Sequence, residues 1–262
     1  MNAQAVVLMV ADLGNSRLKL GSATADGELA ARRALPVTEH AEAEWGATCT
    51  EWGVDPASVR WRIAAVNPPL ERRFTSFLER AGVESARVER FASAVQVPQP
   101  HALVRPEFAG VDRALAVLGA RRRHAASAGR AGVVVCCGTA LTVEFVDEAG
   151  VWLGGAIALG LASTARALHE FTALLPLIEP RDAPDAIGPH TLGALEAGVF
   201  WGAVGTAREL IERGSRSFAV APWVTLTGGD AARIAPWLNR PEALVVPDLV
   251  LEGLASLNNV NK

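Results

Sequence analysis

The segment VADLGNSRLKL, Val10–Leu20, decides the fold expected for this 262-residue chain. An apolar run reaches a glycine, turns through Gly14-Asn15 and returns as a second apolar run, which predicts a strand–turn–strand unit. The segment VVCCGTALTVE, Val134–Glu144, repeats this plan with Gly138-Thr139 at its turn. The wide spacing of the two glycines excludes a short solenoid repeat. It favours a duplicated α/β unit whose halves bind ligand at the glycine-rich strand ends, although two ordinary hairpins would give the same pattern.

Apolar runs and helical patterns alternate along the rest of the chain. A strand ending at Val66 precedes a break at Pro68-Pro69, after which Phe74, Phe77 and Leu78 fall on one face of an amphipathic helix. Strands are also expected at the apolar runs that begin at Ala5, Trp223 and Ala243. Further helices are expected over Val111–Ala126, Ser163–Leu175, Thr191–Arg213 and the segment that follows Pro247 and ends at Asn258.

Composition narrows the class of protein. Half of the residues are hydrophobic and a fifth are charged, which is typical of a soluble globular protein. The net charge of −3 gives no electrostatic reason to expect nucleic acid or membrane as a partner. The one basic run, Arg121–His124, is interpreted as a solvated helix end. No apolar run approaches the ~20 residues that cross a bilayer, and the N-terminus lacks the basic start of a signal peptide.

Three cysteines, Cys49, Cys136 and Cys137, are an odd number in a chain of this length and do not make a disulfide framework. A reducing, cytoplasmic location fits this usage best. Cys136 and Cys137 are adjacent and no second pair exists, so zinc spacing is absent. Neighbouring side chains of a strand point to opposite faces, and a vicinal disulfide would need a strained peptide, so a dithiol switch is not expected.

Three glycine turns carry the residue types expected of a phosphate site: Gly14-Asn15-Ser16, Gly138-Thr139-Ala140 and Thr227-Gly228-Gly229. Such turns can present backbone N–H groups and a side-chain donor to phosphate oxygens. Asp12 precedes the first turn, where a carboxylate can hold Mg²⁺ through water, and Arg17 and Lys19 flank it. Each turn alone is more often structural, but three turns together with the duplication favour phosphate. Neither GxxxxGK[ST] nor a strand-linked GxGxxG is present.

A fourth candidate is Gly110-Val111-Asp112-Arg113. Asp112 is well placed as the N-cap of the helix that follows, and Arg113 stands beside it. This pair suits a general base next to an anion-binding group. A capping aspartate with no chemical role would have the same pattern.

Taken together, these motifs resemble the type III pantothenate kinases, including their Bvg accessory factor-like branch, in the acetate and sugar kinase/Hsp70/actin superfamily. The resemblance covers nearly the whole chain, with eight motifs in order. They are Asp12–Lys19, Gly110–Arg113, Gly138–Thr142, Gly150–Leu161, Phe171–Pro176, Ile187–Gly202, Thr227–Gly229 and Pro247–Leu254.

The resemblance implies an α/β fold of two ribonuclease-H-like (actin-like ATPase) halves with a cleft between them. Residues 1–115 would hold the first phosphate loop, and residues 116–262 the second loop and the adenosine-side turn. It also implies ATP-dependent phosphorylation of pantothenate to 4'-phosphopantothenate, the first step of coenzyme A biosynthesis. The implied cofactors are Mg²⁺ or another divalent ion and a monovalent cation, K⁺ or NH₄⁺. The implied assembly is a homodimer that completes the pantothenate pocket.

The resemblance also implies roles for individual residues. Asp112 would accept the proton of the substrate hydroxyl, Asp12 would hold Mg²⁺ through water, and Cys136 occupies the position of the monovalent-cation aspartate. The first phosphate loop would comprise Asp12, Leu13, Gly14, Asn15, Ser16, Arg17, Leu18 and Lys19, and the second Gly138 and Thr139. Pantothenate would contact Gly110, Val111, Asp112, Arg113 and Thr191.

Four residues depart from the family pattern. Cys136 replaces the aspartate of D-x-G-T, Glu144 stands where aspartate is usual, Leu103 replaces a tyrosine and Leu159 replaces a proline. Potassium prefers oxygen ligands and a thiol is soft, so we expect an active kinase with altered monovalent-cation use.

Two alternatives remain open. The loss of the aspartate at Cys136 also fits a catalytically weak nucleotide-binding relative that acts as a regulatory accessory factor. In the other alternative the fold is the same, but the acceptor of the phosphoryl group is another small hydroxy acid or a sugar. The presence of Gly110–Arg113 and Thr191 counts against it.

Overall fold

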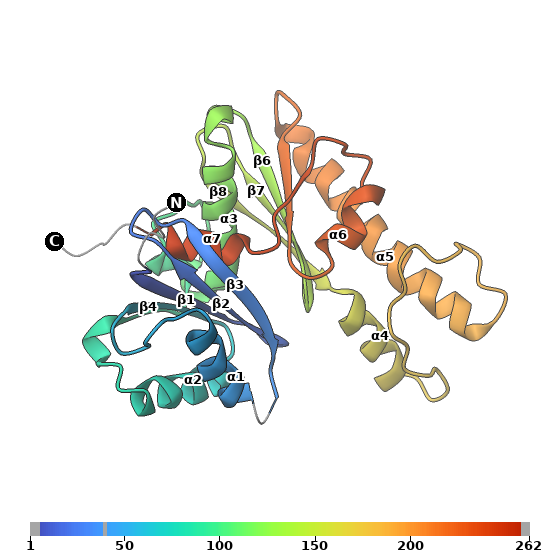
Figure 1. The fold of residues 1–262 in the computed structure, drawn as a ribbon. Coiled ribbons are helices and arrows are strands. Elements are labelled where there is room, and N and C mark those ends of the chain that lie inside the picture. Colours follow the sequence, from blue (N-terminus) through green and yellow to red (C-terminus); the bar gives the residue numbers. More distant parts are fainter. Residues whose placement is uncertain (1–5, 39–40, 258–262) are drawn as a thin grey trace. The chain divides into compact units, whose positions relative to one another are not determined.

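The computed structural model describes residues 6–38 and 41–257, and these fold into two compact units (Figure 1). The first unit takes the described residues up to Gln99, Val104–Gly119 and those from Leu249 onward. The second takes Pro100–Leu103 and Ala120–Asp248. These units differ from the predicted halves 1–115 and 116–262 mainly in the last helix, which folds with the first unit. Ala5 and Asn258, which bound two predicted segments, lie outside the described residues.

The first unit is built on a five-stranded sheet in the order β3-β2-β1-β4-β5. The first three strands form an antiparallel meander, and β1, β4 and β5 run parallel. Its strands are β1 Leu8–Leu13, β2 Arg17–Ala23, β3 Leu29–Pro36, β4 Arg60–Ala65 and β5 Val88–Phe91. The predicted hairpin over Val10–Leu20 is confirmed, and the third strand of the meander was not predicted.

Two helices pack on one face of this sheet, α1 (Ala41–Glu51) and α2 (Pro68–Arg80). Their core is aromatic: the Phe74 ring meets Trp45 edge-on at 5.1 Å and Trp61 at 5.7 Å between centroids. The predicted helix and its apolar face are therefore confirmed. The two prolines begin the helix, because its first-turn N–H groups need no intrahelical partner, and Asn67 caps it.

The second unit repeats the plan in the order β10-β9-β6-β7-β8, again with an antiparallel meander and parallel partners on one side. Because the two sheets have the same connectivity, the predicted duplication is confirmed. The strands are β6 Gly132–Cys137, β7 Ala140–Val146, β8 Trp152–Leu159, β9 Trp223–Thr227 and β10 Leu244–Val245.

The remaining helices are α3 Val111–Arg123, α4 Leu161–Glu170, α5 Thr191–Gly214, α6 Ala231–Ile234 and α7 Leu249–Ala255. Short 3₁₀ turns lie at Ser85–Arg87, Ala94–Gln96, Pro106–Phe108, Ala125–Ser127, Ser215–Ser217 and Ala235–Trp237. Helices α4, α5 and α6 contribute to one core with β6, β7 and β9. Among the described residues, no helix has the length and apolar character needed to cross a membrane.

The helix predicted over Ser163–Leu175 ends earlier than expected, at Glu170. Hydrogen bonds from the following segment take over its last turn. The Thr172 hydroxyl donates to the Leu168 carbonyl at 2.7 Å, and the His169 ring is bonded to the Leu175 carbonyl at 2.8 Å. Pro176, which has no N–H to donate, follows directly.

Candidate functional site

The first glycine turn joins β1 to β2 and exposes the residues predicted to meet phosphate. The Gly14 N–H donates to the Arg17 carbonyl at 3.1 Å, which closes a short loop with Asn15, Ser16 and Arg17 exposed. Asp12 lies half-buried near the end of β1, directly opposite Lys19 of β2. Leu13 and Leu18 are fully buried beside them and anchor the turn in the core. The structure thus gathers the whole predicted loop at one end of the first sheet.

A residue that the sequence did not single out supports this turn. The Asn67 amide donates to the Gly14 carbonyl at 3.4 Å, and its carbonyl oxygen accepts from the Leu70 N–H at 3.1 Å. The Val66 N–H donates to the Leu13 carbonyl at 3.2 Å. Asn67 therefore ties the first turn to the start of α2. The signal that could have revealed it is an amide residue before Pro68-Pro69, at the end of a strand parallel to β1.

The second turn joins β6 to β7, and other backbone segments pack closely around it. The Gly138 N–H donates to the Ala140 carbonyl at 3.0 Å, and the Thr139 carbonyl accepts from the Gly160 N–H at 3.0 Å. Gly160 is the N-cap of α4, so the first turn of that helix lies at the glycine turn. Thr139 itself is half-buried. Helix N-termini and consecutive N–H groups favour anions, so this arrangement suits phosphate oxygens.

The third glycine turn lies against the second. Gly228 has φ +99°, and a side chain there would collide with the backbone of Cys137. The Asp230 N–H donates to the Cys137 carbonyl at 3.1 Å, and the Thr227 hydroxyl donates to the Pro247 carbonyl at 3.2 Å. The second unit therefore brings together two of the three predicted turns, and only glycine fits where they touch.

The adjacent cysteines point to opposite faces of the second sheet, as predicted. Cys137 is buried in the core with the helices, and burial, together with the charges of Cys136 and Asp230, raises its thiol pKa. Cys136 is half-buried and stands directly opposite Thr142 on β7. The Thr142 hydroxyl is buried and has no hydrogen-bond partner among the described residues. Asp12 and Cys136 hold equivalent places, each two residues before the glycine of its turn.

Asp112 is not the N-cap of its helix, so that expectation is wrong. Helix α3 begins at Val111, and Asp112 lies in its first turn. One carboxylate oxygen accepts the N–H of Arg113 at 2.9 Å, a contact that orients the carboxylate toward the start of the helix. A Cβ at Gly110 would lie 2.5 Å from that oxygen, so Gly110 leaves room for the carboxylate. Val111 is fully buried and anchors the motif.

The other predicted substrate contacts lie in two places. Arg113 follows Asp112 and is half-buried in the first unit. Thr191 is exposed at the start of α5 in the second unit, beside the N-cap His190, whose ring accepts the Gly193 N–H at 3.0 Å. Among the described residues no group of three or more His, Cys, Asp or Glu side chains could hold a metal ion.

The remaining departures from the family pattern lie in or beside the second sheet. Glu144 is fully buried, and the Trp152 indole donates to its carboxylate at 3.0 Å. Leu103 lies close to Gly154 on β8. Leu159 is exposed at the end of β8. The segment before Leu103 pairs with β8, since the Trp152 N–H donates to the Pro100 carbonyl and the Ala102 N–H donates to the Trp152 carbonyl.

Solved structures share this pair of sheets. An activator of the 2-hydroxyisocaproyl-CoA dehydratase from Clostridium difficile, with bound ADPNP, is similar over 96% of this chain and 92% of that one (TM-score 0.55, 11% identity). A conserved Campylobacter jejuni protein assigned to the Baf family of transcriptional activators is similar over 94% of each chain (TM-score 0.58, 19% identity). The fold is the actin-like ATPase fold, with two ribonuclease-H-like halves.

Sequence comparison then gives the family of this chain. The family described as type III pantothenate kinase matches residues 8–213. A type III pantothenate kinase from Dehalococcoides mccartyi strain 195 is 30% identical over 97% of this chain and 98% of its own length. One from Geobacter sulfurreducens is 31% identical over 98% of this chain and its full length. The chain belongs to the type III pantothenate kinase family, and its family uses ATP.

Proposed function

We propose that this chain transfers the γ-phosphoryl group of ATP to the primary hydroxyl of pantothenate, giving 4'-phosphopantothenate for coenzyme A biosynthesis. The observation that carries the proposal is the Gly110–Arg113 motif at the start of α3 in a chain that matches the family over residues 8–213. Phosphoryl transfer needs positioning and charge neutralisation more than covalent chemistry. Glycine turns and one well-placed carboxylate meet that need.

Asp112 is the proposed proton acceptor. Its carboxylate is oriented by the Arg113 N–H, and Gly110 leaves the space that it occupies. As the pantothenate oxygen forms its bond to phosphorus, the hydroxyl proton passes to this carboxylate. Arg113, next in the helix, is proposed to pair with the substrate carboxylate. Gly110, Val111 and Thr191 complete the proposed contacts with pantothenate.

The two strand-joining turns are the proposed ATP contacts. Asp12 through Lys19 supply a turn of exposed residues, two cationic side chains and one carboxylate, and Gly138 and Thr139 supply a second glycine turn with a hydroxyl. Mg²⁺, when bound, would neutralise phosphate charge. Asp12 offers the oxygen that this ion prefers, and its half-buried position suits a contact made through water.

The residues at Cys136 do not fit a monovalent cation well. Potassium requires several oxygen ligands, and the side chain here supplies sulfur. The buried Thr142 hydroxyl opposite it is a single neutral oxygen. We therefore propose that turnover depends less on K⁺ or NH₄⁺ than it would with an aspartate at this position.

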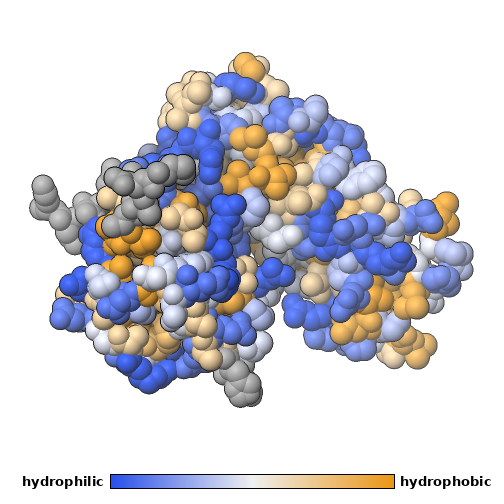
Figure 2. All heavy atoms as spheres, in the orientation of Figure 1, coloured by the Kyte–Doolittle hydropathy of each residue, from blue (hydrophilic) through white to orange (hydrophobic). Residues whose placement is uncertain are grey.

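Apolar residues exposed on the second unit support a homodimer. Phe171 and Leu174 are 85% and 91% exposed in the segment between α4 and α5, and Ile187 is 85% exposed. Hydrophobic side chains gather over α4 and the segment that follows it in the view of Figure 2. Exposed apolar patches of this kind mark interfaces more often than solvated surface. The proposed partner is a second copy of this chain.

A coupled assay that follows ADP release with and without pantothenate tests the function. The wild type should turn over only when pantothenate is present. Asp112→Asn should lower kcat by about 100-fold or more, because the amide cannot accept the proton. Asp55→Asn, at an exposed turn of the first unit, is the matched control and should leave kcat unchanged. Activity in Asp112→Asn equal to that of the wild type would contradict the role of this carboxylate.

A second candidate function is a catalytically weak, nucleotide-binding accessory factor, and Cys136 is the observation that favours it. The same assay separates the two. ATP binding measured by calorimetry without pantothenate-dependent turnover would support the accessory factor.

A further inference from the structure

Helix α7 lies between the first sheet and α3. Leu249, Leu251 and Leu254 are fully buried. On the sheet side, a Cβ at Gly21 of β2 would lie 3.5 Å from the Leu251 side chain. On the other side, α7 meets α3 through the backbone at two places. The helix is thus a layer with protein on both faces, although it comes from the far end of the chain.

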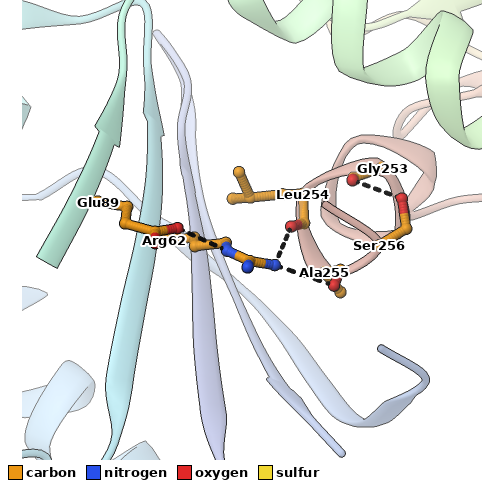
Figure 3. Close-up of polar contacts among 6 residues, drawn as sticks. All are labelled: Arg62, Glu89, Gly253, Leu254, Ala255 and Ser256. Carbon is orange, nitrogen blue, oxygen red and sulfur yellow. Dashed lines mark hydrogen bonds and ion pairs between the residues drawn. The ribbon is translucent and has the colours of Figure 1, made fainter. Parts of the chain in front are cut away.

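A buried arginine fastens α7 to the sheet (Figure 3). Arg62 of β4 has a side chain that is 4% exposed, and its Nε pairs with the Glu89 carboxylate at 2.8 Å. Its Nη1 donates to the carbonyls of Leu254 at 3.3 Å and Ala255 at 3.2 Å. Those carbonyls belong to the last turn of α7, where the Leu254 carbonyl also accepts the Leu257 N–H at 3.4 Å, and a cation at a helix C-terminus is favourable. One guanidinium therefore links β4, β5 and the end of α7.

Glycines set the contact between α7 and α3. A Cβ at Gly119 of α3 would lie 2.5 Å from the Leu249 carbonyl oxygen. A Cβ at Gly253 of α7 would collide with the Leu115 carbonyl oxygen. Leu115 meets Gly253 and Gly119 meets Leu249, so the two helices run antiparallel with their backbones in contact. Side chains larger than hydrogen would hold the helices further apart.

This layer lies between the sheet that carries Asp12 and the helix that carries Asp112, the residues proposed to act on ATP and on pantothenate. Val10, paired with Gly21 and Arg62, faces α7, and Asp12 is two residues further along the same strand. Asp12 therefore projects from the face that α7 covers. Asp112 belongs to α3, on the opposite side of α7. The thickness of the α7 layer sets how far α3 stands from that face of the sheet.

We infer that α7 is the spacer that positions Asp112 relative to the first phosphate turn, with Arg62, Gly119 and Gly253 as its positioning residues. This inference rests on the proposed function for the roles of Asp12 and Asp112. None of the three residues is proposed to touch a substrate. They act through the placement of α3.

The kinetic test uses Gly253→Ala. Alanine favours helix more than glycine does, so any loss reports the contact with Leu115 and not helix formation. A displacement of about 1 Å at the base should lower kcat about 10- to 100-fold, while the KM for ATP stays within about twofold. Gly46→Ala in α1, where a Cβ meets only an ordinary contact with Phe77, is the matched control and should keep its kcat. A folded Gly253→Ala enzyme with wild-type kcat would overturn the inference.

A second test does not depend on activity. Arg62→Met removes the guanidinium but leaves Glu89, which is 41% exposed, able to reach solvent. Hydrogen exchange followed by mass spectrometry should become faster in 249–255 and in 111–119, and remain unchanged in α1. Faster exchange in 249–255 alone would show that α7 does not hold α3 and would refute the inference. A wild type without pantothenate-dependent turnover would instead refute the proposed function, and the exchange experiment would still decide whether α7 holds α3.

Discussion

At the scale of single residues, Cys136 and Asp12 show how one architecture carries different chemistry. Both stand two positions before a turn glycine, on equivalent strands of the two sheets. Asp12 keeps the carboxylate that a hard cation needs, and Cys136 does not. The sheet accommodates either aspartate or cysteine here, because both side chains fit a half-buried position at a strand end.

The Cys136→Asp substitution tests the consequence for cation use. We expect the wild type to gain less than about twofold in kcat when K⁺ replaces a large organic cation, because sulfur is a poor ligand for potassium. The Cys136→Asp variant should gain activation by K⁺, measured by titrating KCl at constant ionic strength. Cys136→Ser controls for the loss of the thiol. Strong potassium activation in the wild type that does not change in Cys136→Asp would contradict this account.

His124 is a second residue whose chemistry depends on its tertiary contacts. It was expected at a solvated helix end, yet its ring stacks on Trp223 at 4.4 Å and is hydrogen-bonded to the Thr225 hydroxyl at 2.8 Å. Burial, and secondarily the charge of Arg130, lowers the pKa of His124. The folded protein then binds fewer protons than the unfolded chain below the ordinary histidine pKa of about 6.5. The stability that comes from burying the neutral imidazole is therefore present above about pH 6.5 and is lost as the pH falls below it.

We therefore expect His124→Gln, which cannot titrate, to lose less stability than the wild type between pH 7.5 and pH 5.5. Thermal unfolding followed by circular dichroism at several pH values measures this difference. His169→Gln, an exposed histidine of the same unit, is the control. Equal pH dependence in the wild type and His124→Gln would show that His124 does not carry the effect.

At the scale of elements, the pairing of β6 with β9 depends on a glycine. Gly132 faces Trp223 across the parallel pair, and a Cβ there would collide with the indole. The indole also stacks on the His124 ring, so it has little room to move. Gly132→Ala should lower the free energy of unfolding by about 1–3 kcal/mol, measured by urea denaturation. Gly205→Ala in α5, where a Cβ meets nothing within 4 Å, should be neutral or stabilising.

The helices and strands that could be predicted are those whose sequence signals lie close together in the chain. The two hairpins, α2 and α5 follow from turns, prolines and apolar spacing within about 25 residues. The edge strand β3 was missed because its residues alternate between half-buried and exposed, with charges among them. The end of α4 was misplaced because His169 and Thr172 bond to nearby carbonyls, which the helical pattern does not reveal.

At the scale of the whole molecule, the exposed apolar residues of the second unit bear on assembly. Light scattering after gel filtration should give twice the chain mass of 27.5 kDa. A double variant, Phe171→Asp with Leu174→Asp, should give the monomer mass, since two charges in an apolar interface are costly. Val220→Asp changes an exposed apolar residue of the same unit outside this segment and should leave the mass unchanged. A wild-type chain that elutes as a monomer at micromolar concentration would contradict the dimer.

The sequence by itself determined the duplicated strand–turn–strand plan, the family and the motif that carries Asp112, because each depends on residues close together in the chain. The tertiary structure alone decided three other features. Asn67 supports the first turn through its hydrogen bond to the Gly14 carbonyl, and the third turn packs on the Cys137 backbone, where only glycine fits. Helix α7 returns to the first sheet because Arg62, almost 200 residues away, satisfies the carbonyls at its end. Such contacts join distant segments, and no local pattern encodes the partner of a buried guanidinium or of a carbonyl at a helix end.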